Sequence, residues 1–355
     1  MKSKKIRVGL IFGGCSAEHE VSIISACSVY KNIDKKKINL ISIYIDKKGN
    51  WKLVESPLIG KENLAKGKSF SFLPWEAKSL RENFSADVYF PLLHGPYGED
   101  GTIQGLFEMA DVPYVGAGVL ASSLGMDKAK MKFIFKAKGL PVVNFLSILD
   151  WQWKAERKEI LKKIKKEFIF PCFVKPSNLG SSIGISKVKE NSQVIQAIDY
   201  AFKYDRKVLV EQGVIGREFE CSILGNDFPQ ASLPGELIPY REFYNYQDKY
   251  IEGKTRFKIP APLPENKIKE IQSLAIKAFR AIECSGMARV DFFMEGKTGK
   301  IHINEINTIP GFTEISMYPK MWEASGISYP KLIEKLIELA FERHHSKKRK
   351  FNFLK

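Results

Sequence analysis

Short apolar runs and helical repeats alternate along the first third of the chain. Residues 6–12 and 40–45 are dense in apolar side chains over a strand's length, which predicts two buried strands. Residues 20–31 lie between them with helical spacing and predict a helix. A further strand is expected at 87–93, before a glycine-rich turn and a helix at 102–109. This β-α-β opening predicts a parallel α/β domain.

The remaining two thirds combine helices with strands of antiparallel character. Apolar residues keep a spacing of three or four from 268 to 283, which predicts a helix, and further helices are expected at 128–138 and 329–342. Five apolar stretches of strand length lie among them. They cover residues 168–174, 208–211, 218–224, 287–294 and 300–306.

Length and element order together predict the domain organisation. A chain of 355 residues is long for one domain and suits two or three. We expect an N-terminal α/β substrate domain at 1–117, a central α+β region at 118–214, a C-terminal α+β region at 215–343 and a basic tail at 344–355. No apolar run approaches the roughly 20 residues of a membrane span, so no membrane insertion is expected.

The cysteines and the N-terminus indicate a cytoplasmic protein. Five scattered cysteines form no C-x-x-C pair and have no histidine at zinc-ligand spacing, which predicts reduced thiols and excludes an ordinary zinc hydrolase site. The basic residues before the apolar run at 8–15 superficially resemble a lipoprotein signal. The run is too short for one and fits a first strand better.

The formal net charge of +16 would suit nucleic acid, an anionic membrane surface or a phosphorylated substrate. Much of the excess lies along 154–166, where apolar positions at helical spacing leave the lysines outside, and in the tail at 347–350. No zinc finger, helix-turn-helix or RNA-binding aromatic signature accompanies it. We predict a solvated helix face and a basic tail without a nucleic-acid partner. A nucleic-acid-binding protein with disrupted metal ligands is the alternative.

Two neighbouring predicted strands carry the strongest chemical signal. Side chains two residues apart on a strand share a face. Glu305 and Asn307 therefore present oxygen donors together, and Arg289 and Asp291 share a face of the preceding strand. Carboxylate and amide oxygens suit Mg²⁺, and an arginine beside them would stabilise developing negative charge. Ordinary polar alternation would explain any one of these residues, but not their combination with the glycine-containing segment 308–313.

A second constellation is Lys175 with the Ser/Gly loop 176–184, where small residues and free amides could surround phosphate oxygens. It is not a P-loop. The nearest match, the Gly-Lys-Ser at 67–69, has its preceding glycine, Gly60, at the wrong distance. A dinucleotide-binding alternative at 116–121 lacks an acidic residue at the ribose position.

The order of these motifs resembles that of the ATP-grasp superfamily, and the match narrows further. Segments 13–22, 93–102 and 307–311 closely resemble the D-alanine:D-alanine ligase family, and the resemblance runs from about residue 6 to residue 343. It implies a three-region ATP-grasp fold whose central and C-terminal regions clamp ATP. It also implies ATP-dependent ligation of two D-alanines to D-alanyl-D-alanine through an acyl phosphate, for peptidoglycan precursor synthesis in the cytoplasm, by a homodimer.

The resemblance implies a role for each nucleotide and metal residue. Lys128 and Lys175 would contact the nucleotide phosphates, Glu211 the adenine and Glu218 the ribose. Two Mg²⁺ ions, for which Mn²⁺ can substitute, would be held by the residues of the first constellation. These are Asp291, Glu305 and Asn307.

It implies substrate and catalytic roles as well. Arg289 and the Gly311 amide would stabilise the tetrahedral intermediate. Glu18 would bind the ammonium group of the first D-alanine, with His94 nearby, and Ser316 would bind the carboxylate of the second. His94 could instead simply cap its turn, and Ser316 could be an ordinary hydroxyl.

The segment 244–250 resembles the family's closing loop. Lys249 would reach the γ-phosphate, and Tyr250 would bond to Ser181, itself linked to Glu18. In the family a tyrosine at this position accompanies peptide synthesis, whereas phenylalanine accompanies ester formation with D-lactate. Tyr250 therefore favours D-alanine as second substrate, with D-lactate or D-serine as alternatives.

Overall fold

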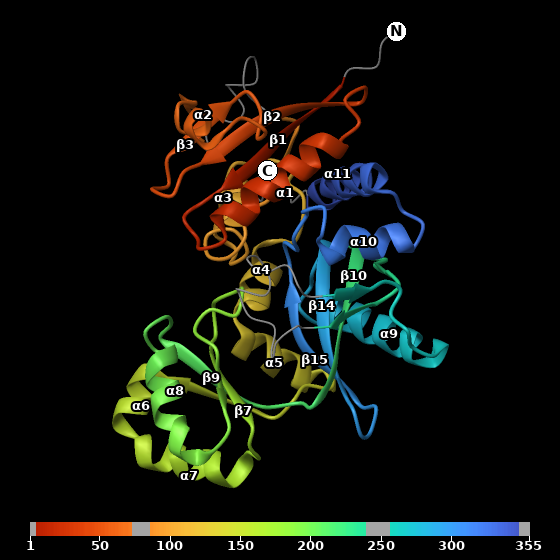
Figure 1. Cartoon of the computed structure of the whole chain (residues 1–355). Coiled ribbons are helices and arrows are strands. Elements are labelled where there is room, and N and C mark those ends of the chain that lie inside the picture. Colours follow the sequence, from red (N-terminus) through yellow and green to blue (C-terminus); the bar gives the residue numbers. More distant parts are fainter. Residues whose placement is uncertain (1–4, 73–85, 239–255, 348–355) are drawn as a thin grey trace, which may run out of the picture.

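The computed structural model of the protein describes residues 5–72, 86–238 and 256–347. Within these ranges it contains three β-sheets with helices packed on them (Figure 1). The first sheet lies in the red and orange N-terminal part, the second in the yellow-green part at the lower left, and the third in the teal and blue C-terminal part.

The N-terminal sheet has the strand order β4-β3-β2-β1-β5. At its centre β1 (Ile6–Gly13) pairs in parallel with β2 (Ile38–Ile45) on one side and β5 (Val88–Pro91) on the other. Two short antiparallel strands, β3 (Trp51–Val54) and β4 (Lys68–Ser69), extend it. The predicted parallel pairing is therefore confirmed, and the short edge strands were missed.

Helices on both faces explain the dense apolar run of β1. Leu10 belongs to one core with buried residues of α1 (His19–Asn32), whereas Ile11 belongs to a second core with buried residues of α3 (Thr102–Met109). A strand covered on both faces has no polar side to alternate with. The short helix α2 (Lys61–Ala65) completes this part.

The central sheet is antiparallel throughout and has a core of its own. Its strand β7 begins after Pro171, later than the predicted residue 168, because proline has no N–H to donate to the ladder. Its strands in order are β6 (Phe145–Leu149), β9 (Lys207–Gln212), β7 (Cys172–Pro176) and β8 (Ser186–Val188). Its helices are α6 (Asp150–Ala155), α7 (Arg157–Glu167) and α8 (Val194–Ala201).

The third sheet has the order β13-β12-β10-β14-β15 with β11 beside β10, and two helices that precede the central sheet in the chain pack on it. These two helices are α4 (Val119–Met126) and α5 (Lys128–Ala137). The strands are β10 (Gly216–Gly225), β11 (Gln230–Ala231), β12 (Gly235–Ile238), β13 (Arg256–Lys258), β14 (Gly286–Glu295) and β15 (Ile301–Asn307). The helices are α9 (Glu265–Ala281), α10 (Met317–Ala324) and α11 (Tyr329–Ser346).

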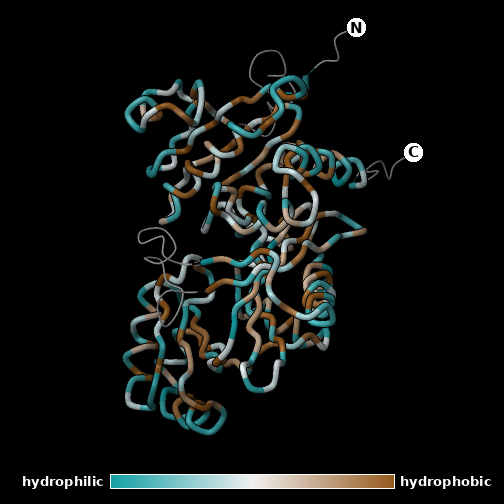
Figure 2. The backbone as a smooth tube through the Cα atoms, turned by 45° about the vertical axis from the view of Figure 1, so that its right-hand side comes forward, coloured by the Kyte–Doolittle hydropathy of each residue, from teal (hydrophilic) through white to brown (hydrophobic). Residues whose placement is uncertain are grey.

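The first and third sheets share a hydrophobic core. Leu10 and Phe90 from the N-terminal sheet are buried in one cluster with Phe312 and with Leu336 of α11. Figure 2 shows apolar segments following the strands and the inner turns of helices through this region. The packing therefore joins the N- and C-terminal parts of the chain, while the predicted domain boundaries themselves stay predictions.

Two composition-based expectations can be compared with the fold. All five cysteines are free thiols, and the lysine-rich α7 buries Ile164 while its lysines stay exposed. No helix within the described ranges is long and apolar enough to cross a membrane.

Candidate active site

The first predicted constellation converges at the centre of the third sheet. The register of β14 and β15 places Arg289 opposite Asn307 and Asp291 opposite Glu305. Arg289 donates from Nε to Asp291 Oδ1 at 2.7 Å and from Nη2 to Oδ2 at 2.6 Å, and Asn307 Nδ2 donates to Asp291 Oδ2 at 3.1 Å. Period-two spacing on two adjacent strands thus produced the convergence that the sequence predicted.

A β-bulge adds one residue to this group that alternation could not predict. The register shifts between Asp291 and Phe292, so that Asn304 falls between the paired positions on β15. Asn304 Oδ1 lies 3.5 Å from Lys175 Nζ, while Glu305 Oε2 lies 3.2 Å from Lys128 Nζ. The two lysines predicted to contact phosphate therefore meet the β15 side of the constellation.

Glu220 is a second residue that the sequence analysis missed. It lies on β10 opposite Asp291, and its Oε2 is 3.1 Å from Arg289 Nε. Burial alone would lower the pKa of Arg289, but the carboxylates of Asp291 and Glu220 raise it well above its ordinary value. Arg289 is therefore a permanent cation. Glu220 could have been found from its two-residue spacing to Glu218 on the same predicted strand.

One cavity of about 740 Å³ joins the constellation to the predicted substrate residues. Its wall is shared by the loop before α1, the glycine-rich turn after β5, the Ser/Gly loop after β7, and the segment after β15. The predicted residues that line it are Glu18, His94, Ser181, Arg289, Glu305, Asn307, Gly311 and Ser316.

The Ser/Gly loop approaches the N-terminal region closely. Ser181 Oγ donates a hydrogen bond to Glu18 Oε1, and an added Cβ at Gly180 would lie 3.0 Å from Glu18 Oε2. Ser181 itself has a φ of 53°, which non-glycine residues rarely adopt. The predicted link between Ser181 and Glu18 is present, and the small residue at position 180 is needed for it.

His94 is a buried, neutral residue in this wall. Its Nδ1 lies 3.1 Å from the Ile309 carbonyl and its Nε2 lies 3.3 Å from Ser25 Oγ. Burial lowers the pKa of His94 below its ordinary value, against the opposing effect of Glu18. It therefore connects its turn to the segment after β15 and faces the cavity as an uncharged imidazole.

Ser316 and Gly311 lie together at the start of α10. Ser316 Oγ accepts a hydrogen bond from the Thr313 amide at 3.0 Å and contacts Thr313 Oγ1 at 2.7 Å. A Cβ on Gly311 would come within 2.8 Å of Ser316 Oγ, so a side chain there would force this hydroxyl to shift. A hydroxyl and a backbone amide are thus held side by side against the cavity.

Glu99 is a third residue that the sequence analysis missed. Its Oε2 accepts from the Gly95 amide at 2.9 Å, and an added Cβ at Gly95 would lie 3.2 Å from Glu18 Oε2. Burial, followed by the nearby charge of Glu18, raises the pKa of Glu99 to about 8. The cavity therefore holds two carboxyl groups around Gly95, one of them protonated at neutral pH. Both belong to segments that the sequence analysis singled out.

The remaining nucleotide residues meet behind this cavity. Lys128 Nζ donates to the Leu179 carbonyl at 2.8 Å, which ties α5 to the Ser/Gly loop. Glu211 of β9 lies 2.7 Å from Lys175 Nζ and 3.4 Å from Lys132 Nζ. Burial would raise the pKa of Glu211, but these lysines lower it, so the carboxylate is ionised. Lys132 was missed, although it follows Lys128 by one helical turn.

Lys249 and Tyr250, predicted to belong to a closing loop, lie outside the described residues. Their roles stay predictions. Glu218 lies half-buried on β10, on the same strand face as Glu220.

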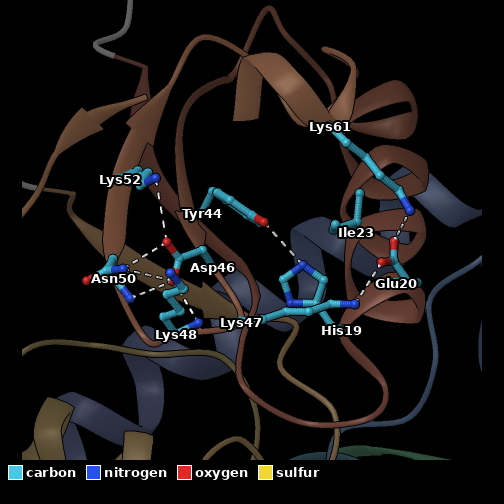
Figure 3. A pocket seen from close by; sticks show the side chains of 10 residues that line it. All are labelled: His19, Glu20, Ile23, Tyr44, Asp46, Lys47, Lys48, Asn50, Lys52 and Lys61. Atoms are coloured by element: carbon cyan, nitrogen blue, oxygen red, sulfur yellow. Dashed lines mark hydrogen bonds and ion pairs between the residues drawn. The ribbon is translucent and has the colours of Figure 1, made fainter. Parts of the chain in front are cut away.

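A second cavity of about 690 Å³ lies on the other side of the α1 N-terminus. Figure 3 shows it between Lys47, Lys52 and Lys61, with the His19 ring and Tyr44 hydroxyl between them. Glu20 pairs with both Lys47 and Lys61, and Lys52 pairs with Asp46. Four lysines, including Lys48, thus share two carboxylates, and no predicted site residue lines this cavity.

Comparison with known proteins decides the family. The model described as D-ala D-ala ligase N-terminus matches residues 7–117, and that described as D-ala D-ala ligase C-terminus matches residues 134–338. The D-alanine–D-alanine ligase of Acetivibrio thermocellus is 47% identical over 98% of this chain and 99% of its own length, and that of Thermoanaerobacter sp. is 49% identical over 99% and 100%.

The chain belongs to the D-alanine–D-alanine ligase family.

Solved structures agree with this D-alanine–D-alanine ligase family assignment. The D-alanine-D-alanine ligase from Coxiella burnetii has a TM-score of 0.86 and 39% identity, and covers 97% of this chain and 96% of its own. The VanG D-Ala:D-Ser ligase from Enterococcus faecalis has a TM-score of 0.82 and 34% identity, and covers 95% and 100%. The predicted α/β ATP-grasp fold is confirmed, and the chain is an ATP-dependent ligase, with ATP as its co-substrate.

Proposed function

We propose that this chain joins two D-alanines to D-alanyl-D-alanine at the cost of one ATP, for peptidoglycan precursor synthesis in the cytoplasm. One observation carries the proposal: a single cavity is lined by the Glu18–Ser181 pair and by Arg289 and Asn307, both of which donate hydrogen bonds to Asp291. The first can bind an amino acid's ammonium group. The second can hold phosphate and developing negative charge.

In this proposal Glu18 orients the first D-alanine so that its carboxylate oxygen attacks the γ-phosphorus of ATP. ADP leaves, and an acyl phosphate forms. The amine of the second D-alanine, whose carboxylate is bound by Ser316, then attacks the acyl carbon. Arg289 and the Gly311 amide stabilise the oxyanion of the tetrahedral intermediate, which collapses with loss of inorganic phosphate.

The protein side chains would supply some of the Mg²⁺ ligands, and the nucleotide would supply others. Among the described residues no three His, Cys, Asp or Glu side chains are grouped to hold a metal alone. Asp291 and Glu305 offer carboxylates, and Asn307 adds an amide oxygen, which leaves further positions for phosphate oxygens and water. Bound Mg²⁺, or Mn²⁺ in its place, would neutralise phosphate charge during transfer.

The nucleotide is proposed to lie between the central and C-terminal regions. Lys128 and Lys175 would bind its phosphates, Glu211 its base and Glu218 its ribose. The ammonium group of Lys128 already contacts Glu305, a proposed metal ligand, and that of Lys175 contacts the neighbouring Asn304. The resemblance of the segment with Lys249 and Tyr250 to the family's closing loop supports a loop that completes the site. We also propose a homodimer, on the family resemblance alone.

Phosphate release tests the proposed reaction. Purified protein with Mg-ATP is expected to release phosphate when D-alanine is supplied and to remain near background with L-alanine. The physical reason is that Glu18 fixes the ammonium group of the first substrate while its carboxylate must meet the γ-phosphate, so the opposite configuration misplaces the methyl group. Equal turnover with L-alanine would overturn the proposal.

A further inference from the structure

Lys132 is a fully buried lysine to which nothing above assigns a role. Its side chain on α5 has 0% exposure, and its ion-pair partner is Glu211 of β9. Its Nζ lies 3.4 Å from Glu211 Oε1 and makes no hydrogen bond within the described part of the chain. Burying an ammonium group is costly unless its charge is paired. The group paired with it is the Glu211 carboxylate.

Glu211 has two lysine partners on opposite oxygens. Lys175 Nζ lies 2.7 Å from Oε2, and Lys132 faces Oε1. A single buried carboxylate needs one counter-ion, so the second lysine is an excess positive charge beside Glu211. Burial lowers the pKa of Lys132 to about 8, which is what an excess buried cation should show.

Phosphate bound by Lys175 would remove this excess. Lys175 also reaches Asn304 Oδ1 at 3.5 Å, toward the proposed phosphate site, so its ammonium group lies between Glu211 and that site. A phosphate that draws Lys175 away from Glu211 would leave the buried carboxylate without its closer counter-ion. Lys132 has no other carboxylate within ion-pair distance among the described residues and would remain beside Glu211.

We propose that Lys132 is a positioning residue for nucleotide recognition, which keeps Glu211 ionised and oriented while Lys175 binds phosphate. Glu211 Oε2, which Lys175 then leaves, accepts a hydrogen bond from the exocyclic amino group of the base, while the buried Oε1 stays beside Lys132. A carboxylate held in this way selects adenine, which presents an amino group, against guanine, which presents a carbonyl oxygen at the same position.

This inference rests on the proposed adenine role of Glu211, so the test measures ADP and GDP binding by calorimetry, which does not need ligase activity. Lys132→Met is close in shape but uncharged. It is expected to weaken ADP binding by roughly tenfold or more, because the hydrogen bond between the base and the Glu211 carboxylate is no longer held in place. It should also reduce the preference for ADP over GDP. Lys132→Arg should keep much of the preference. Lys136→Met, an exposed lysine on the same helix, is the matched control and should change neither.

A double-mutant cycle separates this role from a merely structural one. Lys132→Met combined with Glu211→Gln should bind ADP as weakly as Glu211→Gln alone, because the lysine acts through that carboxylate. Lys132→Met leaves the Glu211–Lys175 ion pair in place, so the fold should persist, and Lys132→Arg, which keeps the charge, serves if it does not. A further loss of ADP binding in the double variant would overturn the proposal, as would an unchanged ADP/GDP preference in Lys132→Met.

Failure of the underlying adenine role has a different signature. If Glu211→Gln leaves the ADP/GDP preference unchanged, Glu211 does not read the base, and the inference about Lys132 is overturned with it. If the preference falls in Glu211→Gln but not in Lys132→Met, the adenine role stands and only the inference is wrong. Steady-state KM values add a second readout: Lys132→Met should raise KM for ATP and leave KM for D-alanine unchanged.

Discussion

The Ser181 hydroxyl donates a hydrogen bond to the Glu18 carboxylate in the wall of the cavity of about 740 Å³. The two residues are 163 positions apart and belong to regions with separate hydrophobic cores. The bond therefore connects the N-terminal region to the Ser/Gly loop of the central region at the point where we propose the first D-alanine binds.

Ser181→Ala tests this link. Removing the hydroxyl leaves Glu18 without the donor that orients it, so KM for the first D-alanine should rise by about tenfold, as expected for a hydrogen bond to a charged group. Thermal stability should change little, because the loop has few buried apolar contacts. Steady-state kinetics with varied D-alanine measure the effect. Ser192→Ala, on the surface of the same region, is the control. Equal kinetics in the two variants would contradict the proposed role.

Asp291→Asn tests the proposed metal and phosphate group. The substitution keeps the shape of the side chain but removes an anionic oxygen. Turnover should fall by about 100-fold or more, because loss of a metal ligand costs more than loss of a residue that only supports a ligand. Arg289 keeps Glu220 as a partner at 3.1 Å, so the fold should persist. Phosphate release and circular dichroism measure the two outcomes. Asp227→Asn on the surface should behave as wild type, and near-normal turnover in Asp291→Asn would place the metal elsewhere.

Glu99 gives the enzyme a predictable pH dependence of stability. Its pKa rises from an ordinary value of 4.5 to about 8 in the folded state. The stabilising contribution of protonated Glu99 to the free energy of unfolding is therefore fully present below pH 4.5 and is lost as pH rises through 8. The reason is that the unfolded chain releases this proton at a lower pH than the folded chain.

Glu99→Gln removes this dependence. Relative to wild type, the variant should gain stability as pH rises from about 5 to 8, at a slope no steeper than about 1.4 kcal/mol per pH unit. Urea unfolding at several pH values measures it. Exposed Glu323→Gln should run parallel to wild type. A Glu99→Gln curve that also runs parallel would show that Glu99 is ionised in the folded state.

Elements with clear periodicity were predictable from the sequence, and those without it were not. The apolar run of β1 and the repeat of α9 extend over 8 and 17 residues, long enough for a period to show. Strands β4 and β11 have two residues each, and no pattern can be read from two positions. They exist because neighbouring strands offer them a partner, which is a tertiary effect.

The candidate site divides in the same way. Asp291, Glu305 and Asn307 were predictable because strand alternation places them on one face. Asn304 was not, because the bulge beside Phe292 breaks that alternation. Lys132 could not be singled out from the sequence, since only the structure shows that its charge is buried.

Product analysis with competing nucleophiles tests the central claim most directly. The protein is incubated with Mg-ATP and equal concentrations of D-alanine, D-serine and D-lactate, and the products are separated and identified by mass. The account predicts D-alanyl-D-alanine as the main product, with one phosphate released for each dipeptide formed. A main product that ends in D-serine or D-lactate, or phosphate release without a dipeptide, would contradict it.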